Sequence, residues 1–166
     1  MKLALVRLLA AYAMMLVPAA GANGPVPNGL CTAQETAWFS CTTSRQRWIG
    51  LCGNAPRALQ YRFGRPGLIE LQFPDNPADG IHRMVFANYA RYQTDRVEVR
   101  FENQGTDYIL FDYSEGGVRR AGVRVATADE KEREFVCTGR ITSRLGELRN
   151  MLKCDADSAL SGGKCP

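Results

Sequence analysis

The fold class is decided by the stretch Leu59-Gln60-Tyr61-Arg62-Phe63-Gly64-Arg65-Pro66-Gly67-Leu68-Ile69-Glu70-Leu71-Gln72-Phe73. Apolar and polar side chains alternate over residues 59–63 and again over residues 69–73. A period of two is typical of β-strands that bury one face. The two runs are separated by a Gly/Pro turn, and this combination predicts an antiparallel hairpin.

The period of two continues on both sides of this hairpin. Further strands are expected over residues 37–41, 84–92, 96–101, 108–113, 118–126 and 135–137. Short segments rich in turn-forming residues separate most of them. Seven or eight short strands joined by tight turns predict an all-β antiparallel meander, closed either as a small barrel or as a sandwich.

One helix is expected near the C-terminus, over residues 143–153. Leu145, Leu148 and Leu152 recur at helical spacing, and Ser143 is available as an N-terminal cap. The domain is therefore expected to be β with one short helix that packs against the sheet.

The N-terminus has the parts of a secretory signal peptide. Two basic residues precede an uncharged apolar run over residues 8–17, and Ala20-Gly21-Ala22 supplies small residues for cleavage. The apolar run is shorter than the roughly 20 residues of a membrane-spanning helix. We therefore expect a signal peptide over residues 1–22 and a single mature β domain over residues 23–166, without a membrane span.

The charge balance argues against a nucleic-acid partner. The 166-residue chain has a formal net charge of +4, and removal of the signal peptide takes away Lys2 and Arg7 and leaves +2. A nucleic-acid-binding domain needs a strong excess of basic residues. The mature domain is also long enough to bury a hydrophobic core of its own.

Six cysteines in the predicted mature domain indicate three disulfides and an oxidising compartment, either periplasmic or extracellular. They are Cys31, Cys41, Cys52, Cys137, Cys154 and Cys165. Cys41 and Cys52 flank a polar turn, and the predicted helix can fold Cys154 back onto Cys137. Cys31 and Cys165 remain as the third pair. The expected pairing is Cys41–Cys52, Cys137–Cys154 and Cys31–Cys165. The main alternative contains Cys154–Cys165 and Cys31–Cys137.

The sequence predicts neither catalysis nor a cofactor. His82 is the single histidine, and the chain has no G-x-S-x-G, phosphate-loop or dinucleotide-binding motif. A metal site is not expected either, because no C-x-x-C pair occurs. Residues 155–158 begin like a calcium loop, but Leu160 and Pro166 stand where such a loop has glycine and glutamate. We therefore expect a non-enzymatic protein with a solvated C-terminal tail.

Stable exported β domains without catalytic groups usually act through a surface, and two segments are candidates for partner binding. The first is a charged, glycine-containing hairpin tip over residues 113–120, with Ser114, Glu115, Arg119 and Arg120. The second combines residue types that protein interfaces favour. It holds Tyr89, Arg91, Tyr92 and Arg96. The alternatives are an ordinary solvated turn for the first segment and an ordinary strand for the second.

Several motifs resemble a pattern in small exported disulfide-rich β proteins of Gram-negative bacteria. They are Phe39-Ser40-Cys41, Leu51-Cys52, Tyr61-Arg62-Phe63-Gly64, Glu70-Leu71, Pro74 and the ending Cys137…Leu148…Cys154-Asp155…Cys165-Pro166. In general type the chain is similar to periplasmic immunity proteins, which neutralise envelope-attacking toxins, and to bacterial lysozyme inhibitors. The resemblance implies an inhibitor or immunity protein whose partner is another protein, a toxin or hydrolase of the envelope. The alternative expectation is an envelope module that binds a glycan, a lipid or peptidoglycan.

Overall fold

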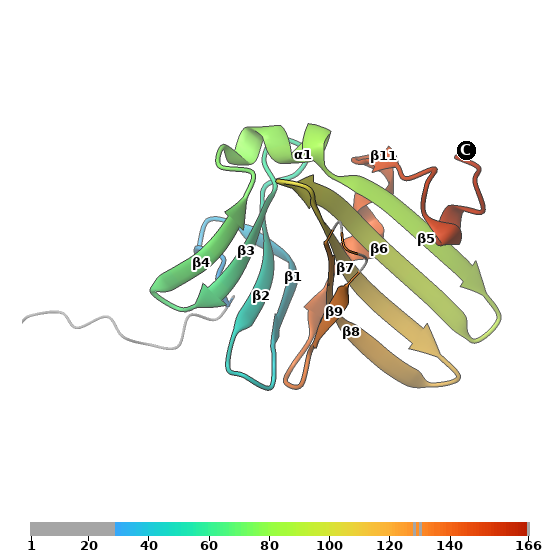
Figure 1. Ribbon diagram of the computed structural model, residues 1–166, viewed down its shortest axis with the longest axis horizontal. Coiled ribbons are helices and arrows are strands. Elements are labelled where there is room, and N and C mark those ends of the chain that lie inside the picture. The colour runs from blue at the N-terminus through green and yellow to red at the C-terminus, as the bar shows by residue number, and fades with distance from the viewer. Residues whose placement is uncertain (1–28, 128, 130, 166) are drawn as a thin grey trace, which may run out of the picture.

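The computed structural model describes residues 29–127, 129 and 131–165, so the predicted signal peptide lies outside the described residues. Two sheets face each other across a shared core (Figure 1). This arrangement is a sandwich and not a closed barrel, which decides between the two closures that the sequence leaves open. In the described part of the chain, no helix is long and apolar enough to cross a membrane.

The first sheet has the strand order β10-β1-β2-β3-β4 and the second has the order β11-β5-β6-β7-β8-β9. Neighbouring strands are antiparallel except for β11 and β5, which are parallel. The strands of the first sheet are β1 (Thr36–Thr42), β2 (Trp48–Gly53), β3 (Gln60–Arg65), β4 (Leu68–Phe73) and β10 (Thr142–Ser143). Those of the second are β5 (Val85–Arg91), β6 (Thr94–Asn103), β7 (Thr106–Glu115), β8 (Val118–Ala126), β9 (Glu132–Val136) and β11 (Lys153–Cys154). The short helices are η1 (Pro77–Asp79), α1 (Gly80–Arg83), η2 (Leu145–Asn150) and η3 (Ala159–Ser161).

Most of the predicted strands form where the period of two indicates them. The stretch that decides the fold class folds as β3 and β4, with Tyr61 opposite Phe73. A bulge interrupts this pair at Gly64, where φ is +148° and a Cβ atom would clash with the Leu68 carbonyl group. Glycine is therefore required at this position of the hairpin.

The apolar faces of the two sheets meet in one core. Phe101 of β6 stacks on Phe73 of β4 and on Tyr108 of β7, with ring-centroid distances of 4.5 and 5.0 Å. Burial of one such ring stabilises a fold by about 1.5–3 kcal/mol. Phe101 thus joins the first sheet to the second by direct aromatic contact.

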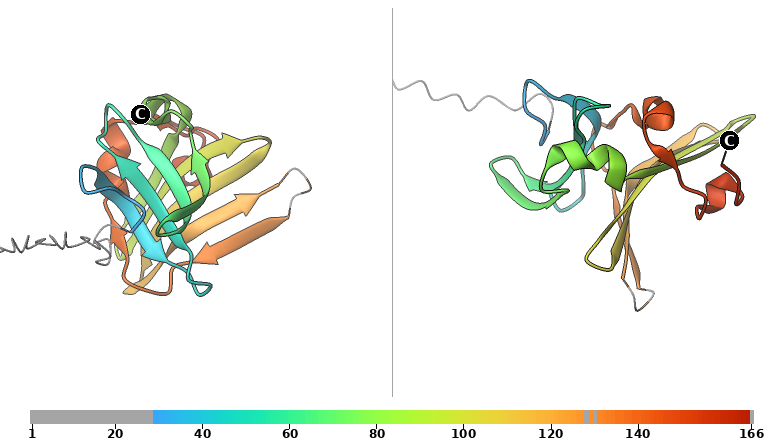
Figure 2. Two further views of the ribbon diagram at one scale, coloured as in Figure 1. Left: turned by 90° about the vertical axis from the view of Figure 1, so that its left-hand side faces the viewer. Right: turned by 90° about the horizontal axis from the view of Figure 1, so that it is seen from above.

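The second sheet extends beyond the first. Figure 1 and the view from above in Figure 2 show β5 to β8 running past the first sheet, so that their far end projects from the sandwich. β6 and β7 remain paired over this length, from Thr94 opposite Glu115 to Asn103 opposite Thr106. The C-terminal segment with η3 lies beside β5 in this projecting part. The projection leaves one end of the second sheet outside the sandwich core.

The three disulfides join Cys31 to Cys52, Cys41 to Cys137, and Cys154 to Cys165. The expected pairing of Cys41–Cys52, Cys137–Cys154 and Cys31–Cys165 is therefore wrong. Of the alternative pairing, Cys154–Cys165 is present and Cys31–Cys137 is not.

The strand register explains these errors. Cys41 lies opposite Ile49, so it has no contact across the hairpin with Cys52. Cys137 follows β9 and forms a bridge with Thr43, which places it beside β1 and next to Cys41. β9 and β11 lie at opposite edges of the second sheet. This order separates Cys137 from the cysteine in β11 and lets Cys41–Cys137 link the two sheets.

The predicted helix over residues 143–153 forms only in part, as the 3-10 helix η2. Leu145 and Leu148 are buried, as the spacing predicts. Ser143 is not the cap, because it belongs to β10 and pairs with β1. Arg144 occupies the N-cap position of η2 and makes no side-chain capping hydrogen bond. The two ends of the predicted helical range form the short strands β10 and β11 instead. Each of these strands pairs at the edge of one of the two sheets.

Candidate functional site

Two hairpin turns lie side by side at the projecting end of the second sheet. The β7–β8 turn consists of Gly116 and Gly117, with φ of +55° and +83°. A two-residue type I′ turn needs positive φ at both positions, which glycine adopts without strain. The β5–β6 turn has Gln93 at φ +54°, and its carbonyl oxygen accepts a hydrogen bond from the Gly116 amide at 2.9 Å. The two turns therefore form one continuous edge.

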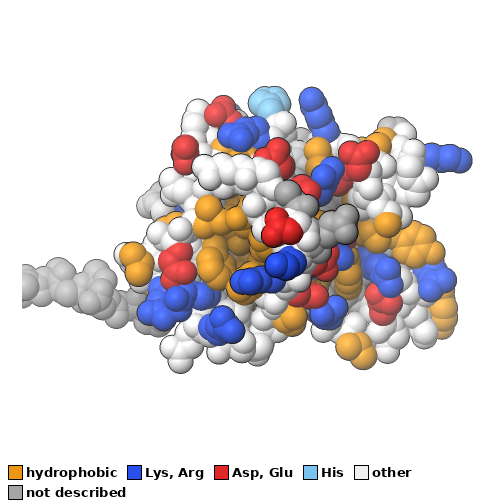
Figure 3. Space-filling model, viewed as in Figure 1, with side chains coloured by type: hydrophobic (Ala, Val, Ile, Leu, Met, Phe, Trp, Pro, Cys, Tyr) orange, Lys and Arg blue, Asp and Glu red, His pale blue; other side chains and the backbone are white. Residues whose placement is uncertain are grey.

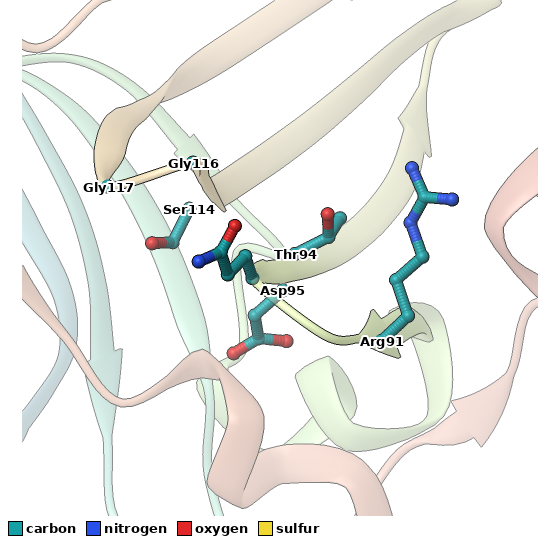
Figure 4. Close-up of a pocket in the computed structure, with 7 residues that line it drawn as sticks. Arg91, Thr94, Asp95, Ser114, Gly116 and Gly117 are labelled. Carbon is teal, nitrogen blue, oxygen red and sulfur yellow. The ribbon is translucent and has the colours of Figure 1, made fainter.

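A shallow hollow of about 560 Å³ lies between the turns (Figure 4). Arg91 and Thr94 line it from the β5–β6 side, and Ser114 lines it from the β7–β8 side. Figure 4 shows Arg91 and Ser114 at opposite ends of the hollow. The hollow is open and is formed by polar residues and glycines, which suits the surface of a partner better than an enclosed small molecule.

Aromatic rings and guanidinium groups alternate across the outer face of the projecting sheet. The cross-strand register places Tyr89, Arg96, Tyr113 and Arg120 in one row on the face opposite the core. The Arg96 guanidinium carbon lies 5.5 Å from the centre of the Tyr113 ring, and that of Arg91 lies 5.9 Å from the Tyr89 ring. Cation–π contacts of this kind favour arginine side chains that lie over the rings. The row is therefore an ordered surface.

Three large apolar side chains at this end are open to solvent. Tyr92 is 87% exposed, Val118 is 71% exposed and Tyr89 is 41% exposed. Tyr89 on β5 and Val118 on β8 are separated by β6 and β7, so these side chains are spread across the end of the sheet. Exposed apolar groups rimmed by polar groups mark interaction sites on protein surfaces. We call this region the tip surface, and it comprises Tyr89, Arg91, Tyr92, Arg96, Glu115, Val118 and Arg120.

Most of the residues that the sequence singles out for binding lie together on the tip surface. The register places Tyr89, Arg91, Glu115 and Arg120 on one face, and Tyr92 lies in the adjoining turn. The structure thus joins the two candidate segments, which are separate in the sequence, into one surface.

Ser114 and Arg119 lie on the other face of the sheet, although Ser114 also lines the hollow between the turns. They pair with each other on the face of the sheet that continues the core. Arg119 donates hydrogen bonds to both carboxylate oxygens of Asp112, each at 2.8 Å. Burial raises the pKa of the Asp112 carboxyl, but hydrogen bonds from Arg119 and Ser143 outweigh burial and hold that pKa below its ordinary value. Arg119 is therefore engaged within the domain and does not belong to the tip surface.

A network of hydrogen-bonded charged side chains lies next to the tip surface, on the same face of the sheet. The Glu98 carboxylate is 7% exposed and accepts hydrogen bonds from the Tyr113 hydroxyl and the Arg124 guanidinium. The Ser158 hydroxyl donates to its other oxygen at 3.1 Å. Burial first, and the Glu98 hydrogen bond second, raise the pKa of Tyr113. Tyr113 therefore keeps its proton and connects the network to the aromatic row.

The C-terminal segment is held on the sheet by Arg100. Its guanidinium group donates to both carboxylate oxygens of Asp155, at 2.8 and 2.9 Å. Asp155 is 4% exposed, so the expectation of a solvated tail is wrong at this residue. Within the described residues, no cluster of three or more side chains could hold a metal ion. The carboxylate that begins the calcium-like sequence thus has a structural partner in the domain.

Sequence reasoning missed the roles of Glu98, Arg100 and Arg124. Alternation was the available signal, because Glu98 and Arg100 stand between apolar residues in a predicted strand and must face away from the core. The burial of Glu98 depends on the C-terminal segment that covers it, and local sequence does not reveal that contact.

The groups on the tip surface are rings, guanidinium groups and carboxylates, which bind partners by stacking, ion pairs and hydrogen bonds. The single histidine, His82, is exposed in α1, away from the projecting end (Figure 1). Comparisons of the chain with protein-family models, with curated proteins and with solved structures give no match.

Proposed function

We propose that this protein is a non-enzymatic binding protein of the periplasm or the extracellular space, and that it binds another protein through the tip surface. In its most specific form, the proposal is an inhibitor or immunity protein that blocks a secreted toxic enzyme acting in the envelope. The observation that carries it is the exposure of Tyr92 and Val118 on two coupled hairpin turns. Tyrosine and arginine, which dominate this surface, are enriched among the residues that supply most of the binding energy at protein interfaces.

The charge pattern favours a protein partner over a nucleic acid. Arg96 is paired with Glu115 at 2.6 Å, and Arg120 is paired with Glu134 at 2.7 Å. Nucleic-acid binding depends on basic groups that can replace the counterions of phosphates. Paired arginines offer less free positive charge, whereas mixed charges can match a complementary protein surface and set the specificity of association.

The shape of the projecting end supports an inhibitory role. The two turns stand beyond the first sheet, and their edge is tied by the hydrogen bond between Gly116 and Gln93. Active sites of enzymes are usually concave, so a protruding, preorganised edge fits a cleft at a low cost of ordering. The three disulfides favour an oxidising compartment, where an envelope toxin would meet this protein.

The direct test uses the purified, oxidised protein as bait. The proteins offered to it are those of the cell envelope and the toxins that are secreted into the envelope. The proposal expects one enzyme to be retained in a stoichiometric complex and its activity to fall in proportion to the complex formed. A captured enzyme that keeps full activity would contradict the inhibitory role. Sensitivity of deletion strains to the captured enzyme would then show whether the protein protects cells.

A second candidate function is glycan binding, which a different hollow favours. It measures about 400 Å³ and lies between the outer face of the second sheet and the C-terminal segment. Arg96, Tyr113 and Asp157 line it, and such groups can stack on a sugar ring and hydrogen-bond to its hydroxyls. Stabilisation against heat by soluble peptidoglycan fragments, increasing with fragment concentration, would support this function. Unchanged melting at millimolar fragment would count against it.

A further inference from the structure

A cavity of about 180 Å³ lies between the two sheets, away from the tip surface. Its lining is apolar and largely aromatic, and residues of both sheets contribute: Tyr61, Phe63, Leu71, Tyr108, Val123, Val125 and Phe135. Phe63 of the first sheet and Phe135 of the second, which both line the cavity, pack edge to face at a ring-centroid distance of 5.6 Å. Both are half-buried, so the cavity has an opening to solvent. Figure 3 shows hydrophobic side chains gathered between the two sheets on this side of the molecule.

The lining includes two tyrosines, Tyr61 and Tyr108, and the hydroxyl of neither forms a hydrogen bond with a described residue. Tyr61 is 1% exposed, and its hydroxyl forms no hydrogen bond with any described residue. The fully enclosed side-chain atoms without a partner are Arg124 Nε and Glu134 Oε1, so the Tyr61 hydroxyl is not shut off from solvent, and Tyr61 is one of the residues that line the cavity. A ligand in the cavity could take the place of water as the hydrogen-bond partner of this hydroxyl.

The Tyr61 hydroxyl is available as a donor. Burial first, and the neighbouring Tyr108 second, raise the pKa of Tyr61 above its ordinary value. The hydroxyl is therefore protonated at neutral pH and can donate a hydrogen bond to an acceptor in the cavity.

Size and lining restrict what could occupy this space. An apolar cavity of roughly 150 Å³ stays dry and binds benzene, whereas sites for drug-sized ligands measure roughly 300–1,000 Å³. This cavity therefore accepts a single ring but not a long acyl chain or a sugar. Four of its seven lining residues are aromatic, and aromatic rings favour edge and offset contacts with another ring.

We propose that the cavity between the sheets is a binding site for a small aromatic molecule that carries a hydrogen-bonding group, such as a phenol, with the ring among Phe63, Tyr108 and Phe135 and the polar group at the Tyr61 hydroxyl. This site shares no residue with the tip surface. Failure of the proposed function would therefore not affect this proposal, and failure of this proposal would not affect the proposed function.

The test compares p-cresol with p-xylene, which have nearly the same shape and differ by a hydroxyl and a methyl group. Binding to the purified, oxidised protein is measured by calorimetry and by ligand-observed NMR. Tyr61→Phe keeps the ring and removes the donor. We expect this variant to bind p-cresol roughly fivefold more weakly than the wild type, the effect of one lost hydrogen bond, and to bind p-xylene within twofold of the wild type.

Two further variants separate filling of the cavity from general damage. Val125→Phe narrows the cavity and should weaken both ligands at least tenfold, whereas Val118→Phe makes the same change at an exposed site on the same strand and should weaken neither. Absence of binding by both ligands, or equal p-cresol affinity in wild type and Tyr61→Phe, would overturn the proposal. Tighter binding of 1-hexanol than of p-cresol would overturn the assignment of an aromatic ligand.

Discussion

The backbone amide of Gly116 donates a hydrogen bond to the carbonyl oxygen of Gln93 across 2.9 Å. This contact joins the turn between β7 and β8 to the turn between β5 and β6. The two turns belong to different hairpins, whose neighbouring strands in the sheet are β6 and β7. Both residues have positive φ, at +55° and +54°. The geometry of each turn therefore sets the position of the other, and the tip surface behaves as one unit.

Replacement of Gly116 by alanine should destabilise the protein by about 1–2 kcal/mol, because residues with a Cβ atom are disfavoured at positive φ. A Cβ atom at Gly116 would meet nothing within 4 Å, so the loss would arise from backbone conformation and not from a clash. Urea unfolding measures it. Gly146→Ala is the control, since that site also has space but no positive φ, and it should not lower stability.

Tyr92→Ala should weaken binding of the captured partner at least tenfold, because truncation of an aromatic anchor at an interface costs about 2 kcal/mol or more. Tyr92 is 87% exposed, so the melting temperature should stay almost unchanged. Leu68→Ala is the matched control, because Leu68 is 59% exposed on β4 of the other sheet. Surface plasmon resonance with the purified partner gives both affinities. Equal losses for the two variants would rule out the tip surface as the interface.

The strands could be predicted from the sequence because their signal is local. Alternation and Gly/Pro turns place β3, β4 and most of β5 to β8 within a few residues of their observed bounds. The disulfide between Cys41 and Cys137 spans 96 residues and depends on which strand lies at which sheet edge. No local pattern carries that information. The fold class was therefore predictable, whereas the connectivity was not.

The candidate site shows the same division between local and non-local information. Alternation through the two-residue turn puts Glu115 and Arg120 on one face and Ser114 and Arg119 on the other, which the sequence would have allowed us to predict. The burial of Glu98 could not be predicted, because it depends on a C-terminal segment 60 residues further along the chain.

Removal of Cys41–Cys137 should cost more stability than removal of Cys154–Cys165. The first bridge closes 96 residues and the second closes 11, and the entropy removed from the unfolded chain grows with the length of the closed loop. The model of loop entropy predicts a difference of about 1–2 kcal/mol between the two double-alanine variants. Urea unfolding without reductant measures it, with the 21-residue bridge Cys31–Cys52 expected to rank between them. A reversed order would contradict this account.

Arg124→Met should destabilise the protein by about 2 kcal/mol, because it leaves the nearly buried Glu98 carboxylate without its charged partner. Glu98→Gln alone should also destabilise it, but the double variant should lose at least about 1 kcal/mol less than the sum of the two. A double-mutant cycle in urea provides the measurement. Arg120→Met is the control, because the Arg120 side chain is 57% exposed and its ion pair with Glu134 should contribute less than about 1 kcal/mol.

The ion pair between Glu35 and Arg62 should make stability depend on acid pH. Both terminal nitrogens of Arg62 donate to the Glu35 carboxylate at 2.7 Å, and the two side chains are 16% and 13% exposed. Burial raises the pKa of Glu35, but hydrogen bonds from Arg62 and Thr32 outweigh it, so the net pKa lies below the ordinary value of 4.5. A carboxyl whose pKa is lower in the folded state stabilises the fold above its unfolded pKa. That stabilisation is lost as the pH falls below 4.5 and through the folded pKa.

Glu35→Gln should therefore lower the free energy of unfolding by about 1–3 kcal/mol at pH 7 and reduce its decline in acid. Other carboxylates, such as Asp112, contribute to the acid decline of both proteins, so the informative quantity is the difference between wild type and variant at each pH. That difference should shrink between pH 5 and pH 3, as measured by urea unfolding. Glu132→Gln changes an exposed glutamate at the edge strand β9 and should give a difference near zero at every pH. A Glu35→Gln difference that stays constant down to pH 3 would show that the ion pair does not account for the acid sensitivity.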